Sequence, residues 1–157
     1  MFYHTTGNFL IKGHADENKR AKKSLVQKRR SHGIIVYSDV TPVGWCQYGP
    51  RPELPRVDNG KTYRSLGLKT EGRKLWRITC FFVDRNNRRK GVGKFGLNAA
   101  LASIEKKGGG IVEAYPSKKS NLGSSLMWTG TVSMFESAGF KAEADLGKSR
   151  VLMRKTV

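Results

Sequence analysis

The order of apolar segments in this chain favours an α/β or α+β sandwich over a helical bundle. A strand signal over residues 74–83, helical spacing over about 93–107 and a second strand signal over 111–116 follow one another directly. Two further pairs of strand-like segments flank this unit, one on each side. The chain has 157 residues, which suits one domain, residues 1–157, with a single buried core.

The first predicted element is a polar helix over residues 14–30. Asp16 and Glu17 stand near its start and Lys28–Arg30 near its end, an order that complements the helix dipole. Its apolar stripe is thin, so we expect the helix to bury few of its side chains. Gly33 is predicted to stop the helix.

A hairpin is predicted next. Residues 33–39 are rich in β-branched side chains, Thr41-Pro42 is predicted to make the turn, and residues 43–50 form the returning strand. Residues 51–74 then form a long polar segment. A loop of this length in a compact domain is usually functional or mobile.

The central unit has the clearest pattern. "KLWRITCFFV" (74–83) is rich in β-branched, aromatic and other apolar residues, as expected for a buried strand. The helix over 93–107 is predicted from apolar residues that recur at helical spacing, namely Leu97, Ala100, Leu101 and Ile104. Lysines and three glycines end it.

The last third predicts a strand, a loop, a helix and a hairpin. The strand "IVEAYP" (111–116) leads into a loop over 117–125. A short helix follows around 131–138, with Gly139 suited to the left-handed position after it. "FKAEAD" and "RVLMRK" are predicted to pair as the final hairpin.

The charge of the chain limits its partners. Thirty Lys and Arg against twelve Asp and Glu give a formal charge of +18 and a pI near 10.3. This imbalance predicts attraction to RNA, DNA, acidic proteins or anionic cofactors, and a solvated basic surface is the alternative. No segment has the length of a membrane span or the pattern of a secretory signal, so we expect a cytoplasmic protein with reduced cysteines and no metal site.

The basic, glycine-rich stretch "RNNRRKGVGKF" (85–95) is the main functional signal. It fails the P-loop pattern, because Phe95 follows Lys94 and Arg88 stands where the first glycine is needed. Gly91, Gly93 and Gly96 match the spacing of a dinucleotide motif. Seven residues, however, separate Val83 from Gly91, whereas in that motif the glycine follows the strand almost directly.

A third pattern, Arg/Gln-x-x-Gly-x-Gly/Ala between a strand and a helix, is matched by Arg88, Gly91 and Gly93. Here "VDRNNRRKGVG" (83–93) resembles the GNAT superfamily of acyl-CoA-dependent N-acetyltransferases. "WTGTVSMFESAGF" (128–140) is similar to the family's later helix. The resemblance spans about residues 33–157 and implies a mixed, mostly antiparallel central sheet with helices on both faces.

The resemblance implies a cradle for the phosphates of acetyl-CoA. A loop entering a helix offers free backbone N–H groups and the positive end of the dipole, and glycines let the backbone approach. Cationic side chains add hydrogen bonds. A solvated basic turn is the alternative. The expected cofactor-binding residues are Phe82, Val83, Arg88, Arg89, Lys90, Gly91, Val92, Gly93, Lys94 and Phe135.

The catalytic assignment follows from the resemblance and from its departures. Phe135 stands where many members have the tyrosine that protonates the leaving thiolate, so Ser133 or Tyr115 is a candidate acid. Trp128 replaces an asparagine near the helix start. Glu113 is the candidate base, acting through a water, and a carboxylate paired to a cation on the sheet is the alternative reading.

Three functions remain open on the sequence. One is acetyl transfer to a primary amine, with acetyl-CoA as donor. A second is an RNA- or tRNA-associated member that grips phosphates through Lys19–Arg30, and a third is a non-catalytic binding module. A homodimer is compatible with the family. "MFYH" (1–4) is expected to be the stub of the family's first strand.

Overall fold

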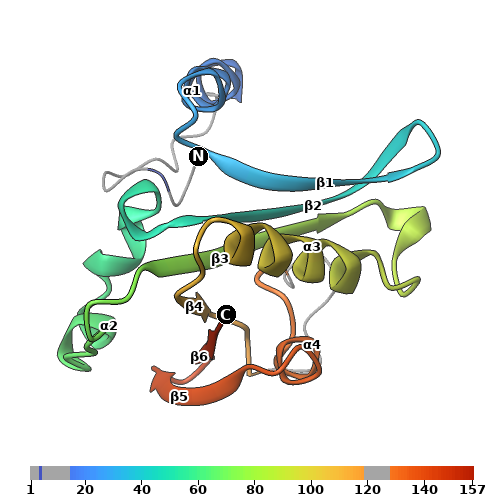
Figure 1. Ribbon diagram of the computed structural model, residues 1–157. Coiled ribbons are helices and arrows are strands. Elements are labelled where there is room, and N and C mark those ends of the chain that lie inside the picture. The colour runs from blue at the N-terminus through green and yellow to red at the C-terminus, as the bar shows by residue number, and fades with distance from the viewer. Residues whose placement is uncertain (1–3, 5–14, 119–127) are drawn as a thin grey trace.

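The computed structural model describes His4, residues 15–118 and residues 128–157 (Figure 1). Its strands form one six-stranded sheet in the order β1-β2-β3-β4-β6-β5. All neighbouring strands are antiparallel except β3 and β4, which are parallel, so the predicted mixed, mostly antiparallel sheet is confirmed. The strands are β1 His32–Ser38, β2 Thr41–Pro50, β3 Leu75–Val83, β4 Ile111–Ala114, β5 Lys141–Leu146 and β6 Arg150–Thr156.

The helices of the described part alternate with these strands as the sequence predicts. The long helix α3 lies across the sheet, and α1 stands beside β1, the edge strand of the sheet (Figure 1). The α-helices are α1 Ala15–Gln27, α2 Lys61–Ser65, α3 Val92–Lys106 and α4 Val132–Glu136. Short 3-10 turns are η2 Arg51–Glu53, η3 Pro55–Asn59 and η4 Arg85–Asn87. No helix among the described residues is long and apolar enough to cross a membrane.

The main core lies between α3 and the sheet. All four apolar residues predicted for the buried face of α3 are buried, and they pack with Cys46, Tyr48 and Ile78 of the sheet. Gly96 permits the close approach, since a Cβ there would lie 3.3 Å from the Cβ of Cys46. Tyr48 adds a hydrogen bond of 2.6 Å between its hydroxyl and that of Ser103 on α3.

The opposite face of the sheet carries α1 and α2. Trp45 neighbours Cys46 on β2, so its side chain points away from α3. The Lys22 ammonium of α1 lies 5.4 Å from the centroid of the Trp45 ring. Tyr63 of α2 reaches Glu113 on β4 over 2.8 Å. Helices therefore cover both faces, as predicted.

The end of α1 differs from the prediction. The helix stops at Gln27, three residues before Arg30, and Gly33 lies within β1. Arg29 adopts φ 55, and the N–H groups of Arg29 and Arg30 bond the carbonyls of Val26 and Leu25. This pattern is a Schellman cap with an arginine at the left-handed position. The helix buries none of its residues, as the thin stripe predicted.

Two connections also differ from the prediction. The first hairpin turns at Asp39-Val40, where Asp39 has φ 52, and Thr41-Pro42 already belongs to β2. The polar segment over 51–74 is largely built of η2, η3 and α2, not an extended loop. Leu54 is fully buried and anchors this segment to the body of the domain.

The C-terminal elements agree with the prediction. Gly139 has φ 85 after α4, and the Phe140 N–H bonds the Phe135 carbonyl at 3.0 Å, so the glycine does occupy the left-handed position. β5 and β6 pair as the final hairpin. Met1–Tyr3 of the expected strand stub and most of the predicted loop over 117–125 lie outside the described residues.

Candidate functional site

The centre of the sheet is forked. β3 and β4 pair only over Leu75–Ile78 and Ile111–Ala114, and β3 then continues alone to Val83. Beyond the paired part, the Phe81 N–H donates to the carbonyl oxygen of Trp128 at 2.6 Å. Parallel strands that part in this way leave an open backbone edge within the sheet, where a ligand can bind.

A register shift bends β3 at the start of the fork. Gln47 of β2 faces Cys80, but the next residue, Tyr48, faces Ile78, so Thr79 is the extra residue of a β-bulge. The Thr79 hydroxyl donates to the Gln47 side-chain oxygen at 3.3 Å. Bulges increase local twist and re-aim the strand, which accounts for the departure of β3 from β4.

The loop after β3 is held by its own polar groups. The Asp84 carboxylate accepts hydrogen bonds from the Asn86 N–H at 3.0 Å and the Asn87 side chain at 3.1 Å. The Arg88 Nε donates to the Val83 carbonyl at 3.3 Å. Arg89 adopts φ 61, a conformation that is strained for a residue with a Cβ.

The loop leads directly into the N-terminus of α3. Gly91 is the N-cap residue with φ 79, and no side chain caps the helix. Its own carbonyl accepts the first helical bond, from the Phe95 N–H at 2.9 Å. The preceding N–H groups, those of residues 92–94, belong to the first turn, which leaves its donors without helical partners.

A cleft of about 510 Å³ opens where the fork meets this helix end. Among the predicted cofactor-binding residues, Phe82, Val83, Arg88, Arg89 and Gly93 line it. Lys90, Gly91, Val92 and Lys94 belong to the same loop and helix start without lining the cleft. The other lining residues are Phe81, Trp128, Gly130, Thr131 and Met134.

Phe82 and Val83 of β3 were predicted to bind the cofactor. Because the Phe81 N–H points into the fork, the alternation of an antiparallel ladder turns the Phe82 backbone toward β2. Phe82 is exposed in its side chain, at 59%, and Val83 offers its carbonyl to Arg88. The open edge is therefore formed by the alternate residues Phe81 and Val83.

Phe135 and Ser133 occupy different environments on α4. Phe135 is fully buried and packs edge-on against Phe81 and Phe140, with centroid distances of 6.0 and 5.1 Å. Phe135 packs behind Phe81, which lines the cleft, and is not itself a lining residue. Ser133 is exposed, and its hydroxyl lies 3.2 Å from that of Thr131, the N-cap residue of the helix.

Glu113 is the centre of a buried polar network. Its Oε1 accepts from Arg154 Nη2 at 2.6 Å and Nε at 3.0 Å, and its Oε2 accepts from the hydroxyls of Tyr63 and Tyr115 at 2.8 and 2.7 Å. Arg77 Nε lies 3.8 Å from the same Oε2. The structure thus shows the paired carboxylate that was the alternative to a base.

The two tyrosines of this network hold their protons more tightly than an exposed tyrosine does. Burial, and then the negative charge of Glu113, raises the pKa of the Tyr115 phenol well above its usual value. The same causes, burial first, raise the pKa of Tyr63. Their rings meet at a centroid distance of 6.3 Å.

Arg77 ties the network to the η3 turn. Its guanidinium, fully buried, makes hydrogen bonds of 2.8 and 2.7 Å to the Asp58 carboxylate and one of 2.8 Å to the Leu54 carbonyl. Partial burial opposes ionisation of Asp58, but the bonds and charges of Arg77 and Arg51 outweigh it and lower its pKa. These bonds hold η3 and α2 against the sheet.

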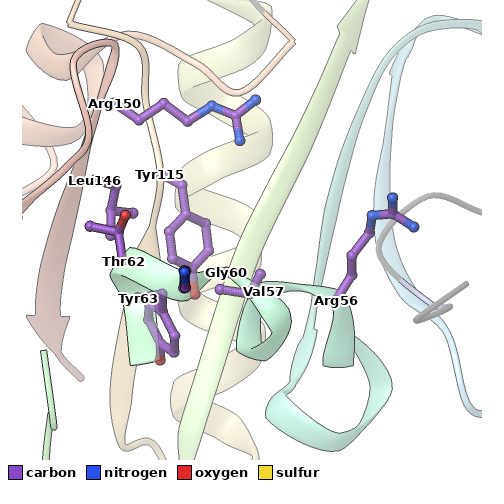
Figure 2. A pocket seen from close by; sticks show the side chains of 9 residues that line it. Arg56, Val57, Gly60, Thr62, Tyr63, Tyr115, Leu146 and Arg150 are labelled. Atoms are coloured by element: carbon purple, nitrogen blue, oxygen red, sulfur yellow. The ribbon is translucent and has the colours of Figure 1, made fainter. Parts of the chain in front are cut away.

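Above this network lies a second cavity, of about 290 Å³ (Figure 2). Tyr63, Tyr115 and Leu146 form part of its wall, and Arg150 reaches across its upper side in the view. The Arg150 guanidinium lies 5.4 Å from the centroid of the Trp128 ring, and Trp128 lines the first cleft. The two cavities therefore share the Arg150–Trp128 pair.

The two cysteines and the possible metal ligands add no reactive group to the described part of the site. Burial raises the pKa of the Cys46 and Cys80 thiols, which fits small core residues better than nucleophiles. Within the described ranges, no group of three His, Cys, Asp or Glu side chains could hold a metal ion.

Sequence reasoning identified the loop and the segment of the far wall, but apart from the substitution at Trp128 it did not name the residues of that wall. Trp128, Gly130, Thr131 and Met134 come from a segment about forty residues after the loop. The likeness of "WTGTVSMFESAGF" to the family's later helix is the signal that pointed to this segment. Arg150 and Arg154 carry no local signal, because β6 reaches the site only through strand order.

Comparison with known proteins agrees with this geometry. The model of the acetyltransferase (GNAT) family matches residues 2–140. No curated protein matches the sequence.

Solved structures share the fold at low sequence identity. A ribosomal-protein-alanine N-acetyltransferase from Brucella melitensis has a TM-score of 0.60 at 15% identity, over 98% of this chain and 84% of that chain. The PaiA N-acetyltransferase of Thermoplasma acidophilum, solved with coenzyme A, has a TM-score of 0.61 at 16% identity, over 92% and 72%. The yncA protein of Salmonella typhimurium, solved with its cofactor acetyl-CoA, has a TM-score of 0.60 at 12% identity, over 98% and 78%.

Proposed function

The chain belongs to the acetyltransferase (GNAT) family, and on that premise we propose that it moves an acetyl group from acetyl-CoA to a primary amine. The observation that carries the proposal is the cleft where the forked sheet meets the uncapped N-terminus of α3. Two of the structures that share its fold were solved with coenzyme A or acetyl-CoA.

The residues of the cleft fit the phosphates of this cofactor. The N–H groups of Val92–Lys94 face outward from the first turn of α3, where a helix binds anions. Arg88 and Arg89 line the cleft beside them. A Cβ at Gly93 would find only Met134 Sδ at 3.6 Å and Val83 Cγ2 at 4.0 Å, so the glycine leaves room in front of the helix end.

The open edge of β3 fits the pantetheine arm. Two of the backbone groups that face the fork are already engaged, because the Phe81 N–H bonds the Trp128 carbonyl and the Val83 carbonyl accepts from Arg88. We propose that the Phe81 carbonyl and the Val83 N–H bind the amides of the arm and that the Val83 N–H polarises the thioester carbonyl. When bound, acetyl-CoA would supply the acetyl group as a thioester. The leaving thiolate is the conjugate base of a thiol with a pKa of about 8.5, as for cysteine, so its departure needs no strong acid. Ser133 and Tyr115 stay candidate acids, with Tyr115 the one that borders the second cavity.

We propose a positioning role for Glu113 in place of general base. Within the part of the chain that the structure describes, the hydrogen bonds that its carboxylate accepts come from Arg154, Tyr63 and Tyr115. A carboxylate engaged in this way and fully buried has no direct path to an acceptor amine. It instead fixes the two tyrosines that shape the second cavity.

Acetyl transfer is tested by incubating the protein with acetyl-CoA and a panel of primary amines. We expect thiol release that depends on the amine, together with a product that mass spectrometry identifies as the acetylated amine. Thiol release that is the same with and without amine, for every amine in the panel, would contradict the proposal.

A second candidate function rests on α1. This helix buries none of its residues and exposes a dense set of cations, namely Lys19, Arg20, Lys23 and, after its end, Lys28, Arg29 and Arg30. Such a surface fits the phosphates of RNA, so an RNA-linked amine is the alternative acceptor. RNA binding that weakens steeply with salt and is lost on neutralising these residues would favour it.

A further inference from the structure

We propose that the second cavity is the acceptor site and that its acceptor is a small amine carrying a carboxylate or phosphate group. The inference rests on the proposed acetyl transfer and adds the chemical class of the substrate. The inference is based on three features of the cavity: the charges that line it, its volume and its position beside the cofactor cleft.

The described lining carries more positive than negative charge. Lys61 and Arg150 contribute cations, and none of the described residues that line the cavity is an Asp or a Glu. The carboxylates next to the lining in sequence already have their own cations: Asp58 pairs with Arg77 and Arg51, and Asp145 with Lys118.

Glu113 does not supply the missing negative charge. It lies beneath the cavity wall, where Tyr63 and Tyr115 cover it with their hydroxyl groups and Arg154 neutralises it. A polycationic amine would therefore be repelled. An anionic group would instead meet the Arg150 guanidinium and the Lys61 ammonium, with which it forms charge-assisted hydrogen bonds.

The positive lining also acts on the amine. Nearby cations disfavour the ammonium form and lower the pKa of an amine in the cavity. A neutral nucleophile is then available near neutral pH, although none of the described residues that line the cavity offers a carboxylate base. The negative group of the acceptor offsets the cost of bringing an amine into this field.

Size and position favour a small molecule. A volume of about 290 Å³ lies at the lower end of the range for ligand sites, roughly 300–1,000 Å³. Arg150 lines this cavity and stacks on Trp128, which lines the cofactor cleft. An amine whose anionic group is held by Arg150 therefore stands next to the place where the thioester would lie.

The test uses matched amines that differ in one anionic group. Ethanolamine is compared with 2-aminoethyl phosphate, and glycinamide with glycine, so that the phosphate and carboxylate arms are separate. Binding is followed by amide chemical shifts in NMR titrations, with and without coenzyme A, and acetylation is followed by thiol release. We expect at least one anionic amine to bind about tenfold tighter than its neutral match, as for a hydrogen bond to a charged group.

Four variants test which residues cause the preference for the anionic amine. Arg150→Gln and Lys61→Gln should each reduce the preference for the anionic amine, whereas Arg150→Lys should retain most of it. Lys106→Gln, an exposed lysine in the last turn of α3, serves as control and should leave the preference unchanged. The largest shifts should fall at residues 60–63 and at Arg150.

The outcomes separate this inference from the proposed function. Equal binding of neutral and anionic amines, or shifts confined to other surfaces, would overturn the anionic acceptor even if acetyl transfer occurs. Acetylation only of amines attached to RNA or protein would overturn it as well. Selective anion binding at this cavity without any acetyl transfer would support the binding site and remove the proposed reaction.

Discussion

The Tyr115 hydroxyl donates a hydrogen bond of 2.7 Å to Glu113 Oε2, while Arg154 Nη2 bonds Oε1 of the same carboxylate at 2.6 Å. Both Glu113 and Arg77 beside it are fully buried. The carboxylate therefore holds the charges and hydroxyls around it in place. These contacts determine the expected effect of removing the Glu113 carboxylate.

Glu113→Gln should destabilise the fold by about 3–5 kcal/mol, because it leaves buried arginine charge without its partner. Urea unfolding measures the loss. Glu105→Gln, an exposed glutamate on α3, is the matched control and should change stability by less than about 0.5 kcal/mol.

The same variant separates positioning from base catalysis. If Glu113 positions the tyrosines, the folded fraction of Glu113→Gln should keep the shape of the pH–rate profile and lose mainly acceptor affinity, seen in KM. An unchanged free energy of unfolding with a lost rising limb of kcat against pH would instead identify Glu113 as the base.

Gly93→Ala should affect stability and cofactor affinity in opposite directions. The new Cβ meets only ordinary contacts, so the helix should gain about 0.5–1 kcal/mol. The methyl group stands before the helix end, and we expect acetyl-CoA affinity to fall about tenfold, the loss of one hydrogen bond to a charged group. Calorimetric titration measures the affinity.

Gly96→Ala is the contrasting variant in the same helix. Its Cβ would lie 3.3 Å from Cys46 Cβ, so we expect lower stability and unchanged acetyl-CoA affinity. If both alanine variants instead bound acetyl-CoA more weakly, each in proportion to its change in stability, the loss of affinity would come from helix packing and not from the cradle.

Arg89→Gly should weaken acetyl-CoA binding without harming the fold. Arg89 holds φ 61, and relief of that strain, of order 1 kcal/mol, offsets the greater freedom of glycine in the unfolded chain. The variant loses one cation of the cleft, so we expect a several-fold rise in Kd for acetyl-CoA at low salt. An unchanged Kd would remove Arg89 from the cradle.

We expect the protein to lose stability in mild acid because of His4. Burial, and then the charge of Lys22, lowers the pKa of its imidazole from 6.5 to about 4. Between those two values the unfolded chain binds more protons than the fold, so stability should fall as the pH drops from about 6.5 to about 4. Urea midpoints against pH measure this slope.

The His4→Gln variant is the control for that slope, since its side chain does not titrate. It should flatten the pH dependence in this window, and a slope equal to that of the wild type would contradict the assignment. Asp58, whose pKa is lowered in the fold, adds a separate loss only below its unfolded pKa of about 3.9.

The elements that the sequence predicted best are those whose signal is local. The apolar face of the helix over 93–107 and the continuous apolar strand before it each bury their own residues, so their pattern needs no knowledge of the partner. The turn at Asp39-Val40 was missed because a proline at position 42 was taken as the turn residue. Arg29 and Asp39 adopt left-handed φ without glycine, which a residue pattern does not reveal.

The site was predictable only in part, because its two walls come from segments about forty residues apart in the chain. The loop over 85–93 carries its chemistry in consecutive residues. Glu113 meets Tyr63 and Arg154 through strand order, across separations of fifty and forty-one residues. The pairing of Arg150 with Trp128 likewise depends on β6 lying next to β4.

Acetyl-CoA-dependent stabilisation tests the central claim most directly. Unfolding is measured with and without acetyl-CoA for the wild type and for Gly91→Glu, which places a carboxylate at the N-cap of α3, where a Cβ has open space. At a hundred times its dissociation constant, the ligand should add about 2.7 kcal/mol to the wild type and little to the variant. No gain in the wild type, or an equal gain in both proteins, would contradict a phosphate cradle at this helix end.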